Sequence, residues 1–119
     1  MTEKKYTWHK LADNIAALQF SDAGLAELEL AGKKICISLN KDQLFACAAK
    51  CPHAGGNMAG GYTDALENIV CPVHRYKFSL QHGRSTGGEG YYLKTYPVQM
   101  RPDGVFVGFE DHNLFNWLK

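Results

Sequence analysis

The sequence lacks the features that take a small protein to a membrane or to nucleic acid. No apolar run reaches about 18 residues, so we expect no membrane-spanning helix. The 13 Lys and Arg residues nearly balance the 12 Asp and Glu residues in a chain of 119, whereas nucleic acids and anionic membranes are bound by clustered positive charge. The charged start of the chain leads into no apolar segment of the secretory type, so we expect a cytoplasmic protein.

Cysteine is scarce too, with four residues at Cys36, Cys47, Cys51 and Cys71. Two disulfides would need an oxidising compartment, so we expect reduced thiols. Cys36 and Cys47 lie inside apolar, strand-like segments and are interpreted as buried structural thiols. Cys51 and Cys71 each lie beside a histidine, and this neighbourhood raises the question of a metal.

The distribution of apolar residues predicts an all-β fold. Short alternating runs are separated by turn residues such as Ala31-Gly32, Lys41-Asp42 and Pro102-Asp103-Gly104, which favour tight turns. Many short strands at close spacing predict a small sandwich or barrel, and we place a single domain over residues 1–119. The expected strands are Tyr6–Lys10, Leu25–Leu30, Lys33–Asn40, Gln43–Ala48, Ile69–Cys71, Lys77–Leu80, Leu93–Arg101 and Val105–Phe109, with Lys10–Ala17 as a short helix or a loop.

Two mixed pairs of cysteine and histidine carry the chemistry. Cys51-Pro52-His53 and Cys71-Pro72-Val73-His74 are separated by 17 residues, and glycine-dense stretches follow at 55–61 and 83–90. Zinc fingers usually pair cysteine with cysteine and histidine with histidine. A blue copper site would leave one cysteine unused. The pattern is better suited to a two-iron, two-sulfur cluster with both cysteines on one iron and both histidines on the other.

This arrangement resembles the Rieske cluster-binding motif. Beyond the two pairs, Cys71-Pro72-Val73-His74-Arg75-Tyr76-Lys77-Phe78 followed by Gly83 is similar to the corresponding run of Rieske ferredoxins. The resemblance covers roughly Trp8 to Phe109. It implies a Rieske-type β-sandwich or barrel with an inserted cluster-binding subdomain made of two loops, about 51–62 and 71–90. It also implies one Rieske 2Fe–2S cluster with Cys51, His53, Cys71 and His74 as its ligands.

Some positions depart from the high-potential members of that family. Gly56 and Val73 occupy the places of two extra cysteines that form a disulfide there, so we expect no disulfide beside the cluster. Tyr76 and Phe78 stand where those relatives have a serine and a tyrosine, and a phenylalanine donates no hydrogen bond to sulfur. We therefore expect a potential at the low end of the Rieske range. Arg75 stands where many relatives have glycine.

The remaining candidates receive structural interpretations. Met58 and Tyr62 lie in the region of the first loop and are secondary candidates for a docking surface. The apolar residues of the tail, 110–119, are expected to pack on the domain, with a partner or self-association surface as the alternative. We expect the tyrosines that follow the second glycine-rich stretch to pack on the barrel and the other histidines to lie on the surface or in turns. These residues are Tyr91, Tyr92 and Tyr96, and His9, His82 and His112.

Three functions are compatible with the sequence. The favoured one is a soluble one-electron carrier that passes electrons from a reductase to an oxygenase or another acceptor, with redox proteins as partners. The second is a small subunit similar to that of assimilatory NAD(P)H nitrite reductase, and the third is a zinc-stabilised interaction module. No general base, nucleophile or substrate pocket is evident, so we expect a component of an oxidoreductase system and not a catalyst acting alone.

Overall fold

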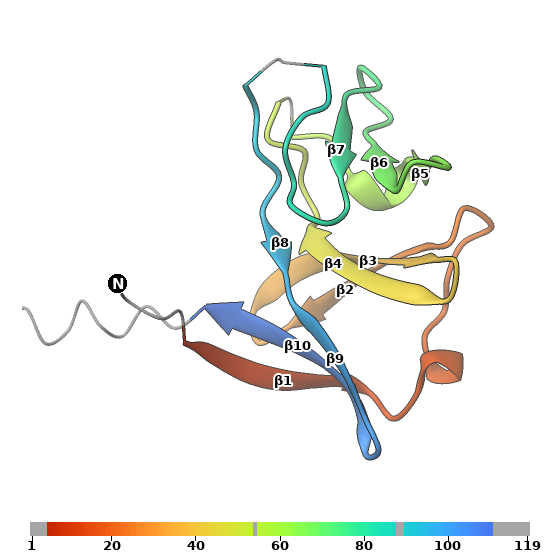
Figure 1. The fold of residues 1–119 in the computed structure, drawn as a ribbon, viewed down its shortest axis with the longest axis vertical. Coiled ribbons are helices and arrows are strands. Elements are labelled where there is room, and N and C mark those ends of the chain that lie inside the picture. The colour runs from red at the N-terminus through yellow and green to blue at the C-terminus, as the bar shows by residue number, and fades with distance from the viewer. Residues whose placement is uncertain (1–4, 54, 88–89, 111–119) are drawn as a thin grey trace, which may run out of the picture.

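The computed structural model describes residues 5–53, 55–87 and 90–110, and these form three antiparallel sheets (Figure 1). The expected all-β class is confirmed. One sheet has the order β1-β10-β9, a second β2-β3-β4-β8 and a third, smaller one β5-β6-β7. The strands are β1 (Tyr6–Ala12), β2 (Leu25–Leu30), β3 (Lys33–Asn40), β4 (Gln43–Ala48), β5 (Tyr62–Thr63), β6 (Asn68–Val70), β7 (Lys77–Ser79), β8 (Thr95–Tyr96), β9 (Val98–Arg101) and β10 (Gly104–Glu110).

The meander β2-β3-β4 follows from its two turns. Ala31-Gly32 and Lys41-Asp42 both have positive φ at each residue, at 51° and 83° and at 52° and 66°. Turns of this kind match the right-handed twist of the strands that they join. The register is therefore fixed locally, and it pairs Cys36 with Cys47 across β3 and β4.

Strands β3 and β4 are buried on both faces, and this explains their nearly continuous apolar sequences. One face packs on the sheet β1-β10-β9 in what we call the basal core, formed by Ile35, Ile37, Leu44, Ala46, Val105, Val107 and Phe109. The other face packs against the two loops and the small sheet in what we call the site core. Its buried residues are Leu25, Cys36, Phe45, Cys47, Cys51, Met58, Ile69, Cys71, Phe78, Leu80 and Leu93. The small sheet and its loops thus rest on the double-sheet base, as Figure 1 shows.

Three local details differ from the expectation. The strand expected over Leu93–Arg101 is broken at Pro97, which has no N–H to donate, and the chain passes there from one sheet to the other as β8 and β9. Lys10–Ala17 is divided between the end of β1 and a single 3-10 turn, η1 (Ile15–Ala17), which Asn14 caps through its side-chain oxygen. The two-residue strand β5 was not expected.

Two further observations complete the fold. A second 3-10 turn, η2 (Met58–Gly60), lies between the first loop and β5. Among the described residues no helix is long and apolar enough to span a bilayer. The tail after Glu110 and His112 lie outside the described residues, so their expected positions remain predictions.

Candidate metal centre

The two mixed pairs lie on loops with the same backbone hydrogen-bond pattern. In the first loop the N–H of Cys51 donates to the carbonyl of Gly56 at 2.8 Å, and the N–H of Gly55 donates back to the carbonyl of Cys51 at 2.9 Å. In the second loop the N–H of Cys71 donates to the carbonyl of Tyr76 at 2.9 Å, and the N–H of Arg75 donates to that of Cys71 at 2.9 Å.

The backbone angles extend this correspondence. Gly55 and Arg75 take the same place in their loops, and both have left-handed φ values, of 72° and 59°. The loops Cys51–Gly56 and Cys71–Tyr76 are therefore two copies of one turn, each of which begins with a cysteine and carries a histidine near its tip.

The thiols lie inside and the imidazoles outside. Cys51 and Cys71 are 2% and 0% exposed in the site core, whereas His53 is half-buried and His74 is exposed. Nδ1 of His53 lies 3.3 Å from Nδ1 of His74. Two nitrogens bound to one tetrahedral metal at about 2.0–2.1 Å would lie roughly 3.4 Å apart, so the imidazoles are already spaced as joint ligands of one metal.

Neighbouring groups shift the pKa of the Cys71 thiol in opposite directions. Burial raises the pKa of Cys71, and the neighbouring thiol of Cys51 raises it further. The backbone N–H groups of Val73 and His74 lower it, because they donate toward the sulfur. The net pKa lies above the usual range, and these two amides would stabilise a thiolate once a metal replaced the proton.

Glycine permits the close approach of the loops. A Cβ atom at Gly56 would clash with Cγ2 of Val73 and would lie 3.0 Å from Sγ of Cys71. Gly61 is equally constrained, because a Cβ there would overlap the carbonyl of Val70 and meet Cδ of Pro72 at 3.3 Å. The first glycine-rich stretch therefore lets one loop lie against the other.

An aromatic group covers one side of His53. The ring of Tyr76 stacks on it with centroids 4.0 Å apart and planes 21° apart, and Tyr91 meets it edge-on at 5.1 Å. The expectation that Tyr91 and Tyr92 pack on the barrel was wrong, since Tyr91 reaches the metal centre and Tyr92 is 58% exposed. Tyr96 does pack on the base, against Phe109 at 5.0 Å.

The structure also gives the positions of the other residues that the sequence singled out. Met58 does not line a docking surface, because it is fully buried in the site core, whereas Tyr62 is 47% exposed. Cys36 and Cys47 are buried free thiols, as expected. Their side chains meet, and this contact and burial raise the pKa of Cys47 well above its usual range.

The remaining histidines that the structure describes have no place in the site. His82 lies exposed in a turn, where its Nδ1 accepts from the N–H of Arg84 at 3.2 Å, as expected. His9 lies on the edge strand β1, where it is partly exposed and its ring contacts Phe109 at 5.2 Å.

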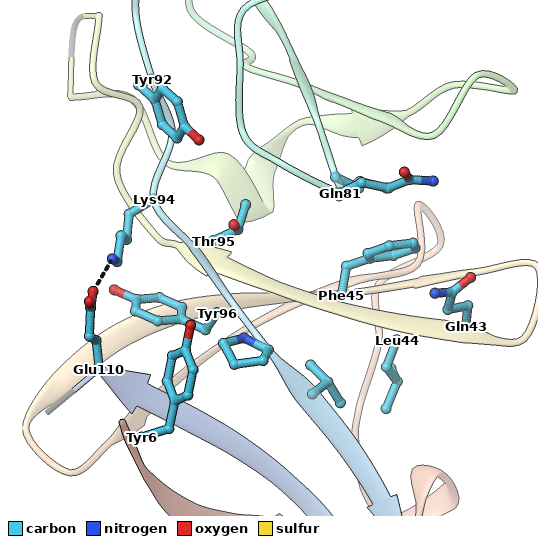
Figure 2. Close-up of a pocket in the computed structure, with 13 residues that line it drawn as sticks. Tyr6, Gln43, Leu44, Phe45, Gln81, Tyr92, Lys94, Thr95, Tyr96 and Glu110 are labelled. Atoms are coloured by element: carbon cyan, nitrogen blue, oxygen red, sulfur yellow. Dashed lines mark hydrogen bonds and ion pairs between the residues drawn. The ribbon is translucent and has the colours of Figure 1, made fainter. Parts of the chain in front are cut away.

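A groove of about 460 Å³ lies between the base and the cluster-binding subdomain (Figure 2). At one end Lys94 forms an ion pair with Glu110 at 3.4 Å, and Gln43 and Gln81 lie toward the other. Its lining is Tyr6, Gln43, Leu44, Phe45, Leu80, Gln81, Tyr92, Lys94, Thr95, Tyr96, Pro97, Val98 and Glu110. The two cysteines and the two histidines of the loops are not among these residues, so the groove is separate from the metal centre.

The donor set distinguishes between kinds of metal site. Within the described part of the chain, no three Cys, His, Asp or Glu side chains converge as a mononuclear site would need. A Rieske 2Fe–2S cluster requires only two protein ligands for each iron, two thiolates on one and two imidazoles on the other. Two buried thiols in contact and two imidazole nitrogens 3.3 Å apart fit that division.

Sequence comparison finds relatives that contain such a domain. The chain is 36% identical over 87 residues to cholesterol 7-desaturase nvd of Bombyx mori, covering 67% of this chain and 19% of that protein. It is 27% identical over 66 residues to the 3-phenylpropionate/cinnamic acid dioxygenase ferredoxin subunit of Photorhabdus laumondii subsp. laumondii, covering 55% of this chain and 63% of that one. The chain therefore spans less than two thirds of these relatives.

Solved structures share the fold over nearly their whole length. The ferredoxin of carbazole 1,9a-dioxygenase from Nocardioides aromaticivorans IC177 matches with a TM-score of 0.69 and 19% identity, covering 83% of this chain and 93% of that one. A protein from Mycobacterium tuberculosis assigned as an NADH-dependent nitrite reductase small subunit matches with a TM-score of 0.76 and 17% identity, covering 88% and 96%.

The family model of the Rieske [2Fe-2S] domain matches residues 9–97, which include both loops and most of the base. It begins where the resemblance to Rieske ferredoxins begins, near Trp8, and ends at residue 97, before the expected end at Phe109. The chain belongs to the Rieske [2Fe-2S] domain family, whose cofactor is a 2Fe–2S cluster.

Proposed function

We propose that this protein is a one-electron carrier whose single 2Fe–2S cluster is held by Cys51 and Cys71 on one iron and by His53 and His74 on the other. The observation that carries the assignment is the pair of matched loops, which place two thiols in contact inside and two imidazole nitrogens 3.3 Å apart outside. When bound, such a cluster takes up and releases one electron, at a higher potential than a cluster with four cysteine ligands.

The protein's own residues would keep water from the sulfurs and expose the imidazoles. The site core surrounds Cys51 and Cys71 with apolar side chains, and backbone N–H groups point toward Cys71. His74 is exposed at the loop tip, where a partner can approach it closely. A short path through an exposed imidazole suits a carrier that meets its partners transiently.

The proposed partners are a reductase that supplies the electron and an oxygenase that receives it. Support comes from the likeness to two ferredoxins of dioxygenase systems, one by sequence and one by fold. We place the protein in the cytoplasm, since four free thiols suit a reducing compartment.

A second candidate is the small subunit of a nitrite reductase complex. The observation that favours it is the likeness in fold and length to the Mycobacterium tuberculosis protein, of which this chain covers 96%. The two candidates differ in assembly. A carrier purifies alone and exchanges electrons with a separate reductase, whereas a subunit co-purifies with a large sirohaem protein.

The ligand assignment is tested by replacing the histidines. His53→Leu and His74→Leu should each lose the visible absorbance and most of the bound iron, whereas His82→Leu, at an exposed turn outside the site, should keep both. Iron analysis and absorbance of the purified proteins make the measurement. Unchanged iron and spectrum in both ligand variants would exclude the assignment, and a colourless wild-type protein that holds zinc would favour the interaction module.

A further inference from the structure

We propose that Arg75 is a docking residue, whose guanidinium pairs with a carboxylate of the redox partner beside the exposed edge of His74. The inference rests on the proposed carrier function and names the chemistry of the partner at that site. It is carried by the conformation of Arg75, by its exposure next to His74 and by the lack of a described acid paired with it.

The backbone at Arg75 is one that glycine adopts freely. Its φ is 59°, and its counterpart in the matching loop is Gly55, with a φ of 72°. A residue with a Cβ atom is unfavourable in this left-handed region. The loop geometry therefore does not call for an arginine, since the first loop makes the same turn and the same hydrogen bonds with glycine.

Among the described residues, no ion pair or side-chain hydrogen bond accounts for the arginine side chain either. The ion pairs formed by described residues are Lys10–Asp13, Lys77–Asp64 and Lys94–Glu110, and none of them involves Arg75. Arg75 is exposed and follows His74 directly in the chain. Strained backbone that persists without an internal benefit is characteristic of functional positions.

The described acids of the cluster-binding region do not neutralise Arg75. Residues 49–90 contain four Lys or Arg residues and three Asp or Glu residues. Among the described acids, Asp64 pairs with Lys77 at 3.6 Å and Glu67 accepts from Gln81 at 2.6 Å. Arg75 thus carries an exposed positive charge, next to His74 in the chain, that no described acid compensates. Such a charge favours a partner with acidic groups around its own redox centre.

Two small oxidants of opposite charge test the inference without knowledge of the natural partner. The reduced protein is mixed with ferricyanide, an anion, or with tris(phenanthroline)cobalt(III), a cation. In each reaction one electron leaves the reduced cluster and reduces one metal ion of the reagent, with no bond made or broken. Stopped-flow absorbance at several salt concentrations gives the rate constants.

Arg75→Gly and Arg75→Asn, two residues that tolerate a positive φ, should lower the ferricyanide rate several-fold and raise the cobalt rate. The salt dependence of both rates should weaken. Arg101→Gln is the matched control, because it removes the same charge at the end of β9, at the opposite end of the molecule from the loops (Figure 1). A change in midpoint potential alone would move both rates in one direction.

Equal effects of the Arg75 and Arg101 variants would overturn the inference, since only net charge would then matter. Loss of the visible spectrum in both Arg75 variants would also overturn it, because Arg75 would then be a structural residue. A wild-type protein without an iron–sulfur spectrum would instead contradict the proposed function, so the two failures are distinguishable.

Discussion

Gly56 lies directly opposite Val73, and the two residues close the contact between the cluster-binding loops. A Cβ atom built at position 56 would clash with Cγ2 of Val73 and would lie 3.4 Å from its Cβ. The resemblance to high-potential Rieske proteins implies that a disulfide joins these two positions in those relatives. Here the contact is made by packing between a glycine and a valine.

Gly56→Ala should destabilise the loops, because its methyl group overlaps Val73 and crowds Sγ of Cys71 at 3.0 Å. Overpacking of this kind costs about 1–3 kcal/mol. The temperature at which the visible absorbance is lost should fall, and adding Val73→Ala should restore part of the loss. A single variant as stable as the wild type would show that the loops separate without cost.

Gly56→Cys combined with Val73→Cys should form a disulfide under mild oxidation. The 3.4 Å between the two Cβ positions is close to the spacing of about 3.5–4.5 Å found in disulfides. Mass spectrometry after thiol alkylation would detect the bridge, with Gly56→Cys alone as the control. Two alkylated cysteines at these positions would contradict the geometry.

Gly55 and Arg75 offer a matched pair of backbone tests. Gly55→Ala should lower the free energy of unfolding by about 1 kcal/mol, and the cost is purely conformational because no atom lies within 4 Å of the added Cβ. Arg75→Gly should raise it by up to about 1 kcal/mol, since it relieves the same strain. Urea denaturation measures both. Destabilisation by Arg75→Gly would mean that the arginine side chain supports the fold.

Phe78→Tyr should raise the midpoint potential. Phe78 is fully buried in the site core together with Cys51 and Cys71, and a hydroxyl there could donate to a cluster sulfur and stabilise the reduced state. We expect the wild type at the low end of roughly −150 to +300 mV and the variant above it. Protein-film voltammetry measures both, with Phe106→Tyr on the basal sheet as the control. A wild-type potential near the top of that range would contradict the hydrogen-bond argument.

Asp64 should make stability depend on pH in the acid range. Burial acts to raise the pKa of Asp64, but hydrogen bonds from Asn68 and Leu66 and the charge of Lys77 outweigh it, so the pKa lies below its usual value. A lowered pKa gives stability that is complete above the unfolded value of about 3.9 and is lost as the pH falls through the folded value.

Asp64→Asn should therefore be less stable than the wild type at neutral pH, and the difference should shrink below about pH 4. Urea midpoints across the pH range test this. Asp13→Asn is the control, because its ion pair with Lys10 is solvent-exposed and should contribute little. A constant difference between Asp64→Asn and the wild type down to pH 2 would contradict the assignment.

The sequence predicted those parts of the molecule that short segments determine. The hairpin turns Ala31-Gly32 and Lys41-Asp42 carry their own backbone preferences, and the strands on either side were placed with the correct bounds. The mixed pairs of the metal centre were equally readable, because the spacing of cysteine and histidine reflects the chemistry of the ligands. Their role as ligands remains a prediction.

Contacts between distant segments could not be predicted in this way. Tyr91 meets His53 only because the chain returns past the loops after the second glycine-rich stretch. Met58 is buried because η2 turns it into the site core, although its glycine-rich surroundings resemble an exposed loop. The break at Pro97 could have been predicted from the proline itself, because proline interrupts the hydrogen bonds of a continuous strand. The expected strand over Leu93–Arg101 did not take it into account.

The pairing of β1 with β10, which joins Tyr6 to Glu110, has a consequence for the order of folding. The meander β2-β3-β4 closes through two-residue turns, so its strands can pair as soon as they leave the ribosome. The first and last described strands must close a loop of about a hundred residues, which costs more chain entropy. We therefore expect the sheet β1-β10-β9 to form last, after the intervening loops have been synthesised. A chain that is shortened into β10 would keep the meander β2-β3-β4 but would lose this sheet.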